Sequence, residues 1–184
     1  MRRILGLFAA SAALIAGCGE GEDRAAPASS PTDVTISSNP VLDRYGILID
    51  RMDFDREDEE LAAMLRGDRA PYVLFSVDGE INNGGFSQFL WNSTGSLFEQ
   101  ARADAELVGA HSAAALLSEL PAILGSSTIP RDREERQRLV DGLSPRQEAA
   151  LSTLDGRWFD EVGAEITDRL NEYYAEHPAS FGSS

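Results

Sequence analysis

The chain has 184 residues, a length that accommodates one domain with a hydrophobic core, and 42% of its residues are hydrophobic. All 16 basic residues are Arg, and 31 acidic residues bring the formal net charge to −15. This charge argues against nucleic acid as a direct ligand and favours a basic partner. A single cysteine excludes an internal disulfide framework and a zinc cluster held by several thiolates.

The N-terminal segment has the plan of a secretory signal peptide. Arg2 and Arg3 precede an apolar run over residues 4–16, which is shorter than the about 20 residues of a transmembrane helix. The stretch LIAGC, residues 14–18 at the end of this run, resembles the lipobox of bacterial lipoprotein signals, in which the cysteine is lipidated and becomes the first mature residue. We therefore expect residues 1–17 to be a signal peptide and Cys18 to anchor the chain to a membrane.

Residues 18–40 are rich in Gly, Pro, Ser and Ala, a composition typical of a flexible linker. Removal of residues 1–17 takes away two of the 16 arginines and none of the 31 acids, so the net charge falls from −15 to −17. Gly19 stands where Asp would often signal retention in the inner membrane. We expect an exported lipoprotein that, in a bacterium with two membranes, faces the periplasm from the outer membrane. One folded domain over residues 41–184 is expected to follow the linker.

The first three predicted helices lie before the most unusual motif of the chain. Apolar residues recur at helical spacing over residues 41–52 and again over 57–66, where Gly67 supplies a stop signal. Pro71 is suited to the first turn of a third helix, with Asp68 as its cap. This third helix leads into the NNGG sequence.

Further helices are predicted over residues 97–109, 112–124 and 131–140, and another begins after Ser144. The last predicted helix carries apolar residues every three or four positions from Trp158 to Tyr173 and ends before Pro178. No segment alternates apolar and polar residues over the length of a strand. The predicted fold class is all-α.

The sequence EINNGGFSQFLWN, residues 80–92, raises the question of whether it binds a ligand or bends the chain. Gly84 and Gly85 are poor helix formers that adopt positive φ without strain, so they are expected to break or bend the helix. The favoured interpretation is structural capping, with Gln88 one turn from Asn92 and able to bond to it. A shallow polar binding site formed by Asn83, Gln88 and Asn92 is the alternative. A phosphate cradle is disfavoured because no strand precedes the glycines.

The motif resembles the hallmark ExxNGGFxQFxxNxxG of the DNA-mimic-protein family, an all-helical bacterial family. The positions that carry the match are Asn83, Gly84, Gly85, Phe86, Gln88, Phe89, Asn92 and Gly95. The later stretches LDGRWFD and LNEYYAEHP also resemble the family's closing region. The family is named for acidic proteins that occupy the DNA-binding face of a regulator, so the resemblance implies a non-catalytic role in protein binding.

The remaining candidate sites, a calcium loop, a histidine metal site and a catalytic serine, find no support in the sequence, which favours a non-catalytic role. The densest acidic patch consists of Asp53, Asp55, Glu57, Asp58, Glu59 and Glu60. It fails as a calcium loop, because Asp58 stands where an EF-hand needs Gly and Met64 where it needs Glu. His111 and His177 are far apart and have no metal-binding pattern, and no serine lies in a hydrolase motif.

We therefore expect a lipid-anchored, acidic, helical protein-interaction module of the cell envelope, without a catalytic residue, cofactor or metal. Its expected partners are the membrane, through Cys18, and a basic protein surface, and the acidic patch is the expected contact. The alternative is an envelope enzyme or small-ligand-binding domain that uses the NNGGFSQF region. A pocket with a titratable group at this region would favour the alternative.

Overall fold

The computed structural model describes residues 39–182, which form eight α-helices and three short 3₁₀ helices and contain no strand. The elements are α1 (Pro40–Arg51), η1 (Phe54–Arg56), α2 (Glu57–Ala63), α3 (Arg66–Trp91), η2 (Ser93–Leu97), α4 (Phe98–Val108), α5 (His111–Leu124), α6 (Arg133–Asp141), α7 (Pro145–Glu161), α8 (Gly163–Glu176) and η3 (Pro178–Ser180). The all-α prediction is confirmed. The predicted signal peptide, Cys18 and most of the linker lie outside the described residues.

Capping side chains from neighbouring residues mark the starts of several helices. Asn39 accepts hydrogen bonds from the first turn of α1, and Asp132 accepts one from Glu135 N at the start of α6. Ser144 and Gln147 form a capping box at the start of α7, as the Ser-Pro signal predicted. These ends depend on neighbouring residues, so sequence reasoning places them well.

The predicted boundary between the second and third helices is wrong. α2 ends at Ala63, and α3 begins at Arg66, so Gly67 lies in the first turn of α3 and stops no helix. A Cβ at Gly67 would come within 2.5 Å of Ser180 O, because the C-terminal residues pack closely here. Pro71 lies inside α3, and the residue before the helix is Leu65.

Asp68 is not a cap but part of a tertiary contact. Its carboxylate forms an ion pair with Arg44 of α1 and accepts a hydrogen bond from Gly182 N at 3.0 Å. The same Arg44 donates to Gly182 O at 2.7 Å. This polar cluster fastens the C-terminal residues to α1 and α3.

The predicted last helix, from Trp158 to Tyr173, crosses a helix boundary in the structure, so Trp158 belongs to the preceding helix. α7 ends at Glu161 and α8 begins at Gly163, with Val162 at φ −103° between them. The usual helical φ is about −63°. Val162 N still donates to Trp158 O, so the apolar period passes through the junction with little disturbance. This continuity explains why the sequence pattern does not reveal the division.

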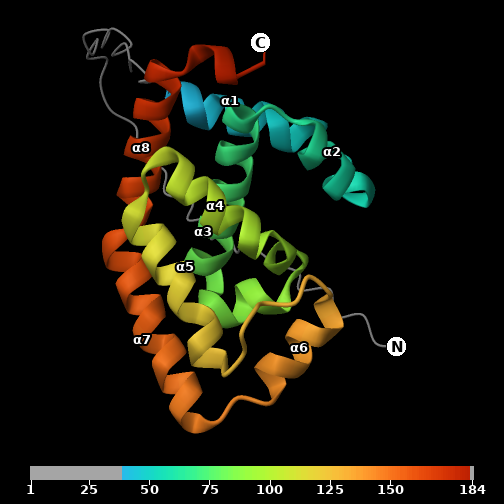
Figure 1. Ribbon diagram of the computed structural model, residues 1–184, viewed down its shortest axis with the longest axis vertical. Coiled ribbons are helices and arrows are strands. Elements are labelled where there is room, and N and C mark those ends of the chain that lie inside the picture. The colour runs from blue at the N-terminus through green and yellow to red at the C-terminus, as the bar shows by residue number, and fades with distance from the viewer. Residues whose placement is uncertain (1–38, 183–184) are drawn as a thin grey trace, which may run out of the picture. The chain divides into compact units, whose positions relative to one another are not determined.

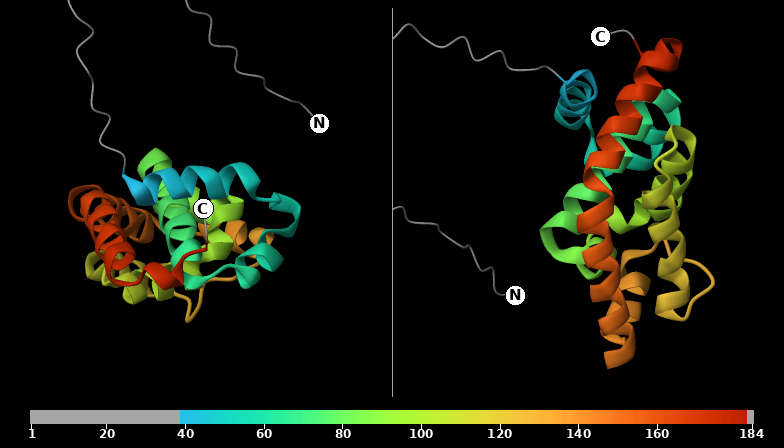
Figure 2. Two further views of the ribbon diagram at one scale, coloured as in Figure 1. Left: turned by 90° about the horizontal axis from the view of Figure 1, so that it is seen from above. Right: turned by 90° about the vertical axis from the view of Figure 1, so that its left-hand side faces the viewer.

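α3 is the central helix of the domain, and it contacts α1, α4, α6, α7, α8 and η2 (Figure 1). α7 and α8 follow one another along one side, next to α5 (Figure 2). The core is built from apolar side chains of these helices, including Ile81, Phe86, Phe89, Leu116, Leu120, Ile166 and Leu170. No helix within residues 39–182 is both long enough and apolar enough to cross a membrane.

Candidate functional site

The NNGG sequence produces a kink inside α3. Gly84 and Gly85 both have non-helical backbone angles, and Gly85 has φ +73°, in the region that favours glycine. The helix resumes at Phe86, and Phe86 and Phe89 are fully buried. The predicted bend is confirmed, and it lies at a glycine with positive φ.

The helix segment after the kink is capped by a carboxylate from another helix. Asp155 of α7 accepts a hydrogen bond from Phe86 N at 2.7 Å. A Cβ on Gly85 would lie 2.6 Å from Asp155 Oδ2, so the glycine also makes room for this carboxylate. Burial raises the pKa of Asp155, and the hydrogen bond from Phe86 opposes the shift. Asp155 thus accepts the N–H of Phe86 at the start of the second half of α3, as the side chain of an N-cap residue would.

A second carboxylate joins the first half of α3 to α7. Trp158 Nε1 donates to Asp78 Oδ1 at 2.9 Å, and Asn82 Nδ2 donates to the same oxygen at 2.7 Å. The Trp158 ring also packs edge-on against Phe86, with centroids 5.4 Å apart. Burial raises the pKa of Asp78, while the two hydrogen bonds oppose the shift. The LDGRWFD stretch therefore holds both halves of the kinked helix.

The two hallmark amides converge on one acidic side chain. Gln88 Nε2 and Asn92 Nδ2 donate to Glu80 Oε2 at 3.1 and 2.8 Å. The predicted bond between Gln88 and Asn92 is therefore replaced by a shared acceptor. Asn83 is exposed, and its side chain makes no hydrogen bond to any residue in the range 39–182. The structure does not bring Asn83 together with the other two.

The C-terminal end of α3 is capped by Arg136, a buried residue of α6. Its guanidinium donates to Leu90 O at 3.0 Å and Asn92 O at 2.9 Å, and also to the carbonyls of Pro130 and Arg131. A positive charge is favourable at the negative end of a helix dipole. Desolvation by burial lowers the pKa of Arg136, an effect that adjacent Arg133 reinforces.

The last hallmark residue is Gly95, and any side chain at this position would clash with its neighbours. A Cβ at this position would lie 2.5 Å from Arg136 Nε and 2.8 Å from Phe89 O. Gly95 therefore lets the buried guanidinium approach the end of α3. Within the hallmark, Gly85, Phe86, Phe89 and Gly95 are explained by packing, whereas Gln88 and Asn92 orient Glu80.

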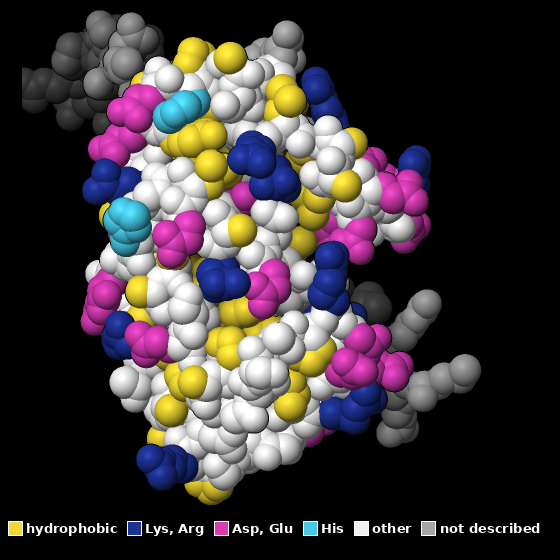
Figure 3. Space-filling model, viewed as in Figure 1, with side chains coloured by type: hydrophobic (Ala, Val, Ile, Leu, Met, Phe, Trp, Pro, Cys, Tyr) yellow, Lys and Arg dark blue, Asp and Glu magenta, His cyan; other side chains and the backbone are white. Residues whose placement is uncertain are grey.

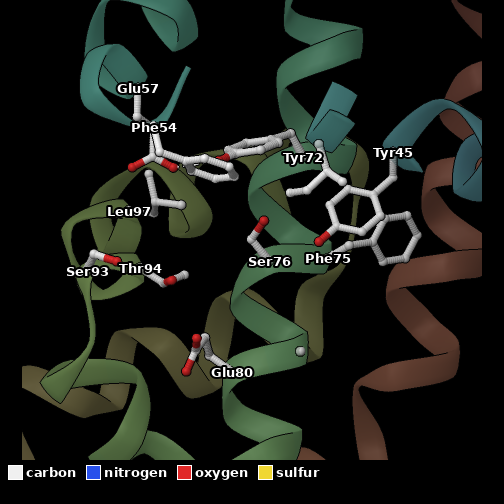
Figure 4. Close-up of a pocket in the computed structure, with 12 residues that line it drawn as sticks. Tyr45, Phe54, Glu57, Tyr72, Phe75, Ser76, Glu80, Ser93, Thr94 and Leu97 are labelled. Carbon is white, nitrogen blue, oxygen red and sulfur yellow. Dashed lines mark hydrogen bonds between the residues drawn. The ribbon is translucent and has the colours of Figure 1, made fainter. Parts of the chain in front are cut away.

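Glu80 also lines a pocket of about 340 Å³ beside α3 (Figure 4). The pocket lies between α1, η1, the middle of α3 and η2, and Glu57 of α2 lines its other end. Tyr72 OH donates to Glu57 Oε1 at 2.5 Å. Burial, this hydrogen bond and the charge of Glu57 raise the pKa of Tyr72, so the phenol keeps its proton. Asn83, Gln88 and Asn92 do not line the pocket, but two of them hold the carboxylate that does.

The predicted acidic surface comprises Asp53, Asp55, Glu57, Asp58, Glu59 and Glu60, and it lies on η1 and the first turn of α2. Figure 3 shows Asp and Glu side chains gathered over α2 at the edge of the domain. Asp58 pairs with Arg131 at 2.5 Å and Glu59 with Arg56 at 2.7 Å, both at exposed positions. Glu57 differs from the others because it accepts the Tyr72 hydroxyl, and it is half-buried, as is Glu60.

The histidines occupy helix ends, as predicted. His111 is the first residue of α5, and His177 follows the last turn of α8. Within residues 39–182, no group of three or more His, Cys, Asp or Glu side chains is arranged to hold a metal ion.

Sequence reasoning missed four polar residues that organise the site: Asp78, Glu80, Arg136 and Asp155. The sequence pattern could have indicated Glu80, because it is the first residue of the hallmark. The indication for Asp155 was weaker, since it rested only on the position of this residue in the LDGRWFD stretch. No sequence feature separates Arg136 from the other arginines of its helix, because the α3 carbonyls that it caps lie more than 40 residues away.

These features define an acidic, all-α domain built around a kinked central helix with capped ends. The DMP19-like protein family model matches residues 62–177, more than half of the 184 residues, and the chain belongs to this family. The match confirms the DNA-mimic-protein resemblance and contains all eight hallmark residues. It begins after Asp53–Glu60, so the acidic surface precedes the matched range. Comparison with curated proteins and with solved structures found no match.

Proposed function

We propose that this chain is a lipid-anchored protein-interaction module of the bacterial cell envelope, and that its acidic surface binds a basic protein surface. The observation that carries the proposal is the exposed group of carboxylates on η1 and α2. Membership of a family named for acidic DNA mimics supports the same class of function. Anchoring through Cys18 rests on the lipobox-like sequence.

The carboxylates of α2 are not required by the core. Leu61 is the buried residue of this helix, and Asp58 and Glu59 are exposed. Acidic side chains in the first turn do favour the positive end of the helix dipole, but each contributes only about 0.3–1 kcal/mol when exposed. A run of four acids exceeds what capping a seven-residue helix needs, and this excess charge is available to a partner.

In the described part of the chain, ion pairs with nearby arginines engage only two of the six acids of this surface. The two exposed ion pairs engage Asp58 and Glu59, and exposed pairs of this kind contribute only about 0–1 kcal/mol. An incoming basic surface could exchange these partners at low cost. Binding of this type forms rapidly and weakens as salt rises, because exposed charges are screened over about 8 Å at physiological ionic strength.

The test is a capture experiment with the full chain, purified in a neutral detergent and immobilised, using a bacterial envelope extract. The test variant combines Asp55→Asn, Asp58→Asn, Glu59→Gln and Glu60→Gln, and retains Glu57 because of its bond to Tyr72. A matched variant neutralises four exposed acids elsewhere: Asp141→Asn, Glu148→Gln, Asp160→Asn and Asp168→Asn. We expect the test variant to lose the captured partner and the matched variant to retain it.

Salt provides the second arm of this experiment. The partner captured by the wild-type chain should be released as the salt concentration rises from low to physiological and higher values. A partner that the test variant holds as well as the wild type does, or that high salt does not release, would contradict recognition by the acidic surface.

The anchor is tested separately by metabolic labelling with a fatty acid. The wild-type chain should take up label and fractionate with membranes, whereas Cys18→Ala should do neither, because acyl chains supply about 0.8 kcal/mol of membrane affinity per buried methylene. Absence of label on the wild-type chain would contradict the lipoprotein assignment without affecting the acidic-surface proposal.

A further inference from the structure

The pocket beside α3 is a feature of the fold to which the proposed function gives no role, although Glu57 belongs to both the pocket and the acidic surface. Its volume of about 340 Å³ lies in the range of small-ligand sites, about 300–1,000 Å³. Figure 4 shows the Ser76, Ser93 and Thr94 hydroxyls around the same space, with Glu57 and Glu80 toward opposite ends. The pocket therefore presents oxygen atoms from three separate elements, α2, α3 and η2, to one ligand.

The charged side chains that line the pocket are all acidic. The lining contains the carboxylates of Glu57 and Glu80 and, within the described residues, no arginine or histidine. Each carboxylate is oriented through one oxygen: Glu57 Oε1 accepts from Tyr72, and Glu80 Oε2 accepts from Gln88 and Asn92. The other oxygen of each has no hydrogen bond to residues 39–182, so each carboxylate can accept from a bound donor.

Aromatic side chains form much of the remaining wall. Tyr45 packs against Phe75 with ring centroids 5.4 Å apart and against Tyr72 at 6.5 Å. Phe54 lies at the edge of the pocket and is 65% exposed, the highest value among the large exposed apolar residues of the described chain. Aromatic faces attract organic cations through their negative electrostatic potential, and nearby carboxylates add to this attraction.

We propose that this pocket binds the primary ammonium group of an alkylamine. Such a group offers three hydrogen-bond donors, which suit the free carboxylate oxygens and the hydroxyls, while its alkyl chain packs against the aromatic wall. The amine is either a lysine side chain of a protein or a free diamine, and both present the same chemistry. The proposal rests on the pocket alone, so failure of the acidic-surface proposal does not affect it.

The experiment measures binding to the full chain in a neutral detergent by titration calorimetry. The probes are N-acetyl-lysine methylamide, N-acetyl-norleucine methylamide as its uncharged analogue, and 1,5-diaminopentane. We expect the lysine amide or the diamine to bind at least about tenfold more tightly than the norleucine amide. The stronger of the two charged probes assigns the source of the amine. Equal binding of the norleucine amide, or no binding of either charged probe, would overturn the proposal.

Two variants locate the binding. Glu80→Gln removes the charge but keeps an oxygen that can accept from Asn92, and it should weaken binding of the charged probe by at least about tenfold. Glu148→Gln, an exposed change on α7, should leave the affinity unchanged. Equal loss in both variants would show attraction to net charge, and this result would overturn a pocket site.

Gly79→Leu provides a steric test that does not depend on charge. Gly79 lines the pocket, and a Cβ there meets no atom within 4 Å, so a side chain can begin at this position without a clash at Cβ. Leucine also has a higher helix propensity than glycine, so a loss of binding would not reflect a weakened helix. We expect this variant to bind the charged probe at least tenfold more weakly. Unchanged affinity in both Gly79→Leu and Glu80→Gln would place the amine elsewhere.

Discussion

Phe86 N donates a 2.7 Å hydrogen bond to Asp155 Oδ1 and thereby joins the kink of α3 to α7 across 69 residues of sequence. The kink frees this backbone N–H from the regular helical pattern, and the carboxylate gives it a partner in a largely apolar environment. Gly85 provides both the turn and the space for Asp155. The hallmark motif and the LDGRWFD stretch therefore form one structural unit.

Asp155→Ala should destabilise the domain because it leaves Phe86 N without its acceptor. An unpaired buried donor costs about 1–3 kcal/mol. Asp155→Asn keeps an oxygen acceptor and removes the cost of burying a charge, so its unfolding free energy should lie closer to that of the wild type. Urea unfolding of both variants measures the difference, with exposed Asp160→Asn as the control in the same helix. Equal stability of Asp155→Ala and the wild type would contradict the capping role.

The half-buried Asp78 should make stability depend on pH. Burial raises its pKa above the ordinary value of 3.8 in the folded state. The folded protein then binds more protons than the unfolded chain, so this contribution to stability is fully present below about pH 3.8 and is lost as the pH rises through the raised value.

Asp78→Asn tests this pH dependence, because it retains an acceptor for Trp158 and Asn82 but does not titrate. Its unfolding free energy should rise relative to that of the wild type as the pH increases from about 4 to 7. Denaturant unfolding at several pH values measures the difference, and ¹³C NMR of the Asp78 carboxyl group follows its titration. A difference that does not change with pH would refute the prediction.

Gly85→Ala should cost about 1–2 kcal/mol from the positive φ alone, and more because the new Cβ meets Asp155. Gly79→Ala is the matched control, since it lies in the same helix with open space at Cβ. This control should stabilise the helix by about 0.5–1 kcal/mol. Thermal unfolding should therefore move in opposite directions for the two variants, and a shared direction would be inconsistent with the strain at Gly85.

Arg136→Met should destabilise the domain by about 2–3 kcal/mol, because several carbonyls at the end of α3 lose a charged donor. Arg136→Lys should recover only part of this loss, since an ammonium cannot reproduce the planar set of five donors. Arg138→Met, at an exposed position of the same helix, should change the unfolding free energy by less than about 0.5 kcal/mol. Similar losses at both positions would show that the buried capping contacts contribute little.

Local chemistry in the sequence was sufficient to predict the all-α class, most helix starts and the bend at Gly85. Ser144 and Gln147 cap α7 through contacts within three residues, and the two adjacent glycines disfavour a regular helix wherever they lie. The burial of Phe86 and Phe89 follows from their spacing on one helical face. These features need only interactions among neighbours or the helical period.

The tertiary structure alone decided which polar groups meet. Arg136, Asp155 and Trp158 find their partners on α3 across 40 to 80 residues, and Glu80 and Glu57 face the same pocket only because η1 and α2 fold beside α3. The exposed acids of α2 and the half-buried Asp78 are the same kinds of residue in the sequence. Their environments differ because the packing of whole helices sets which carboxylates lose water, and helical periodicity does not encode that packing.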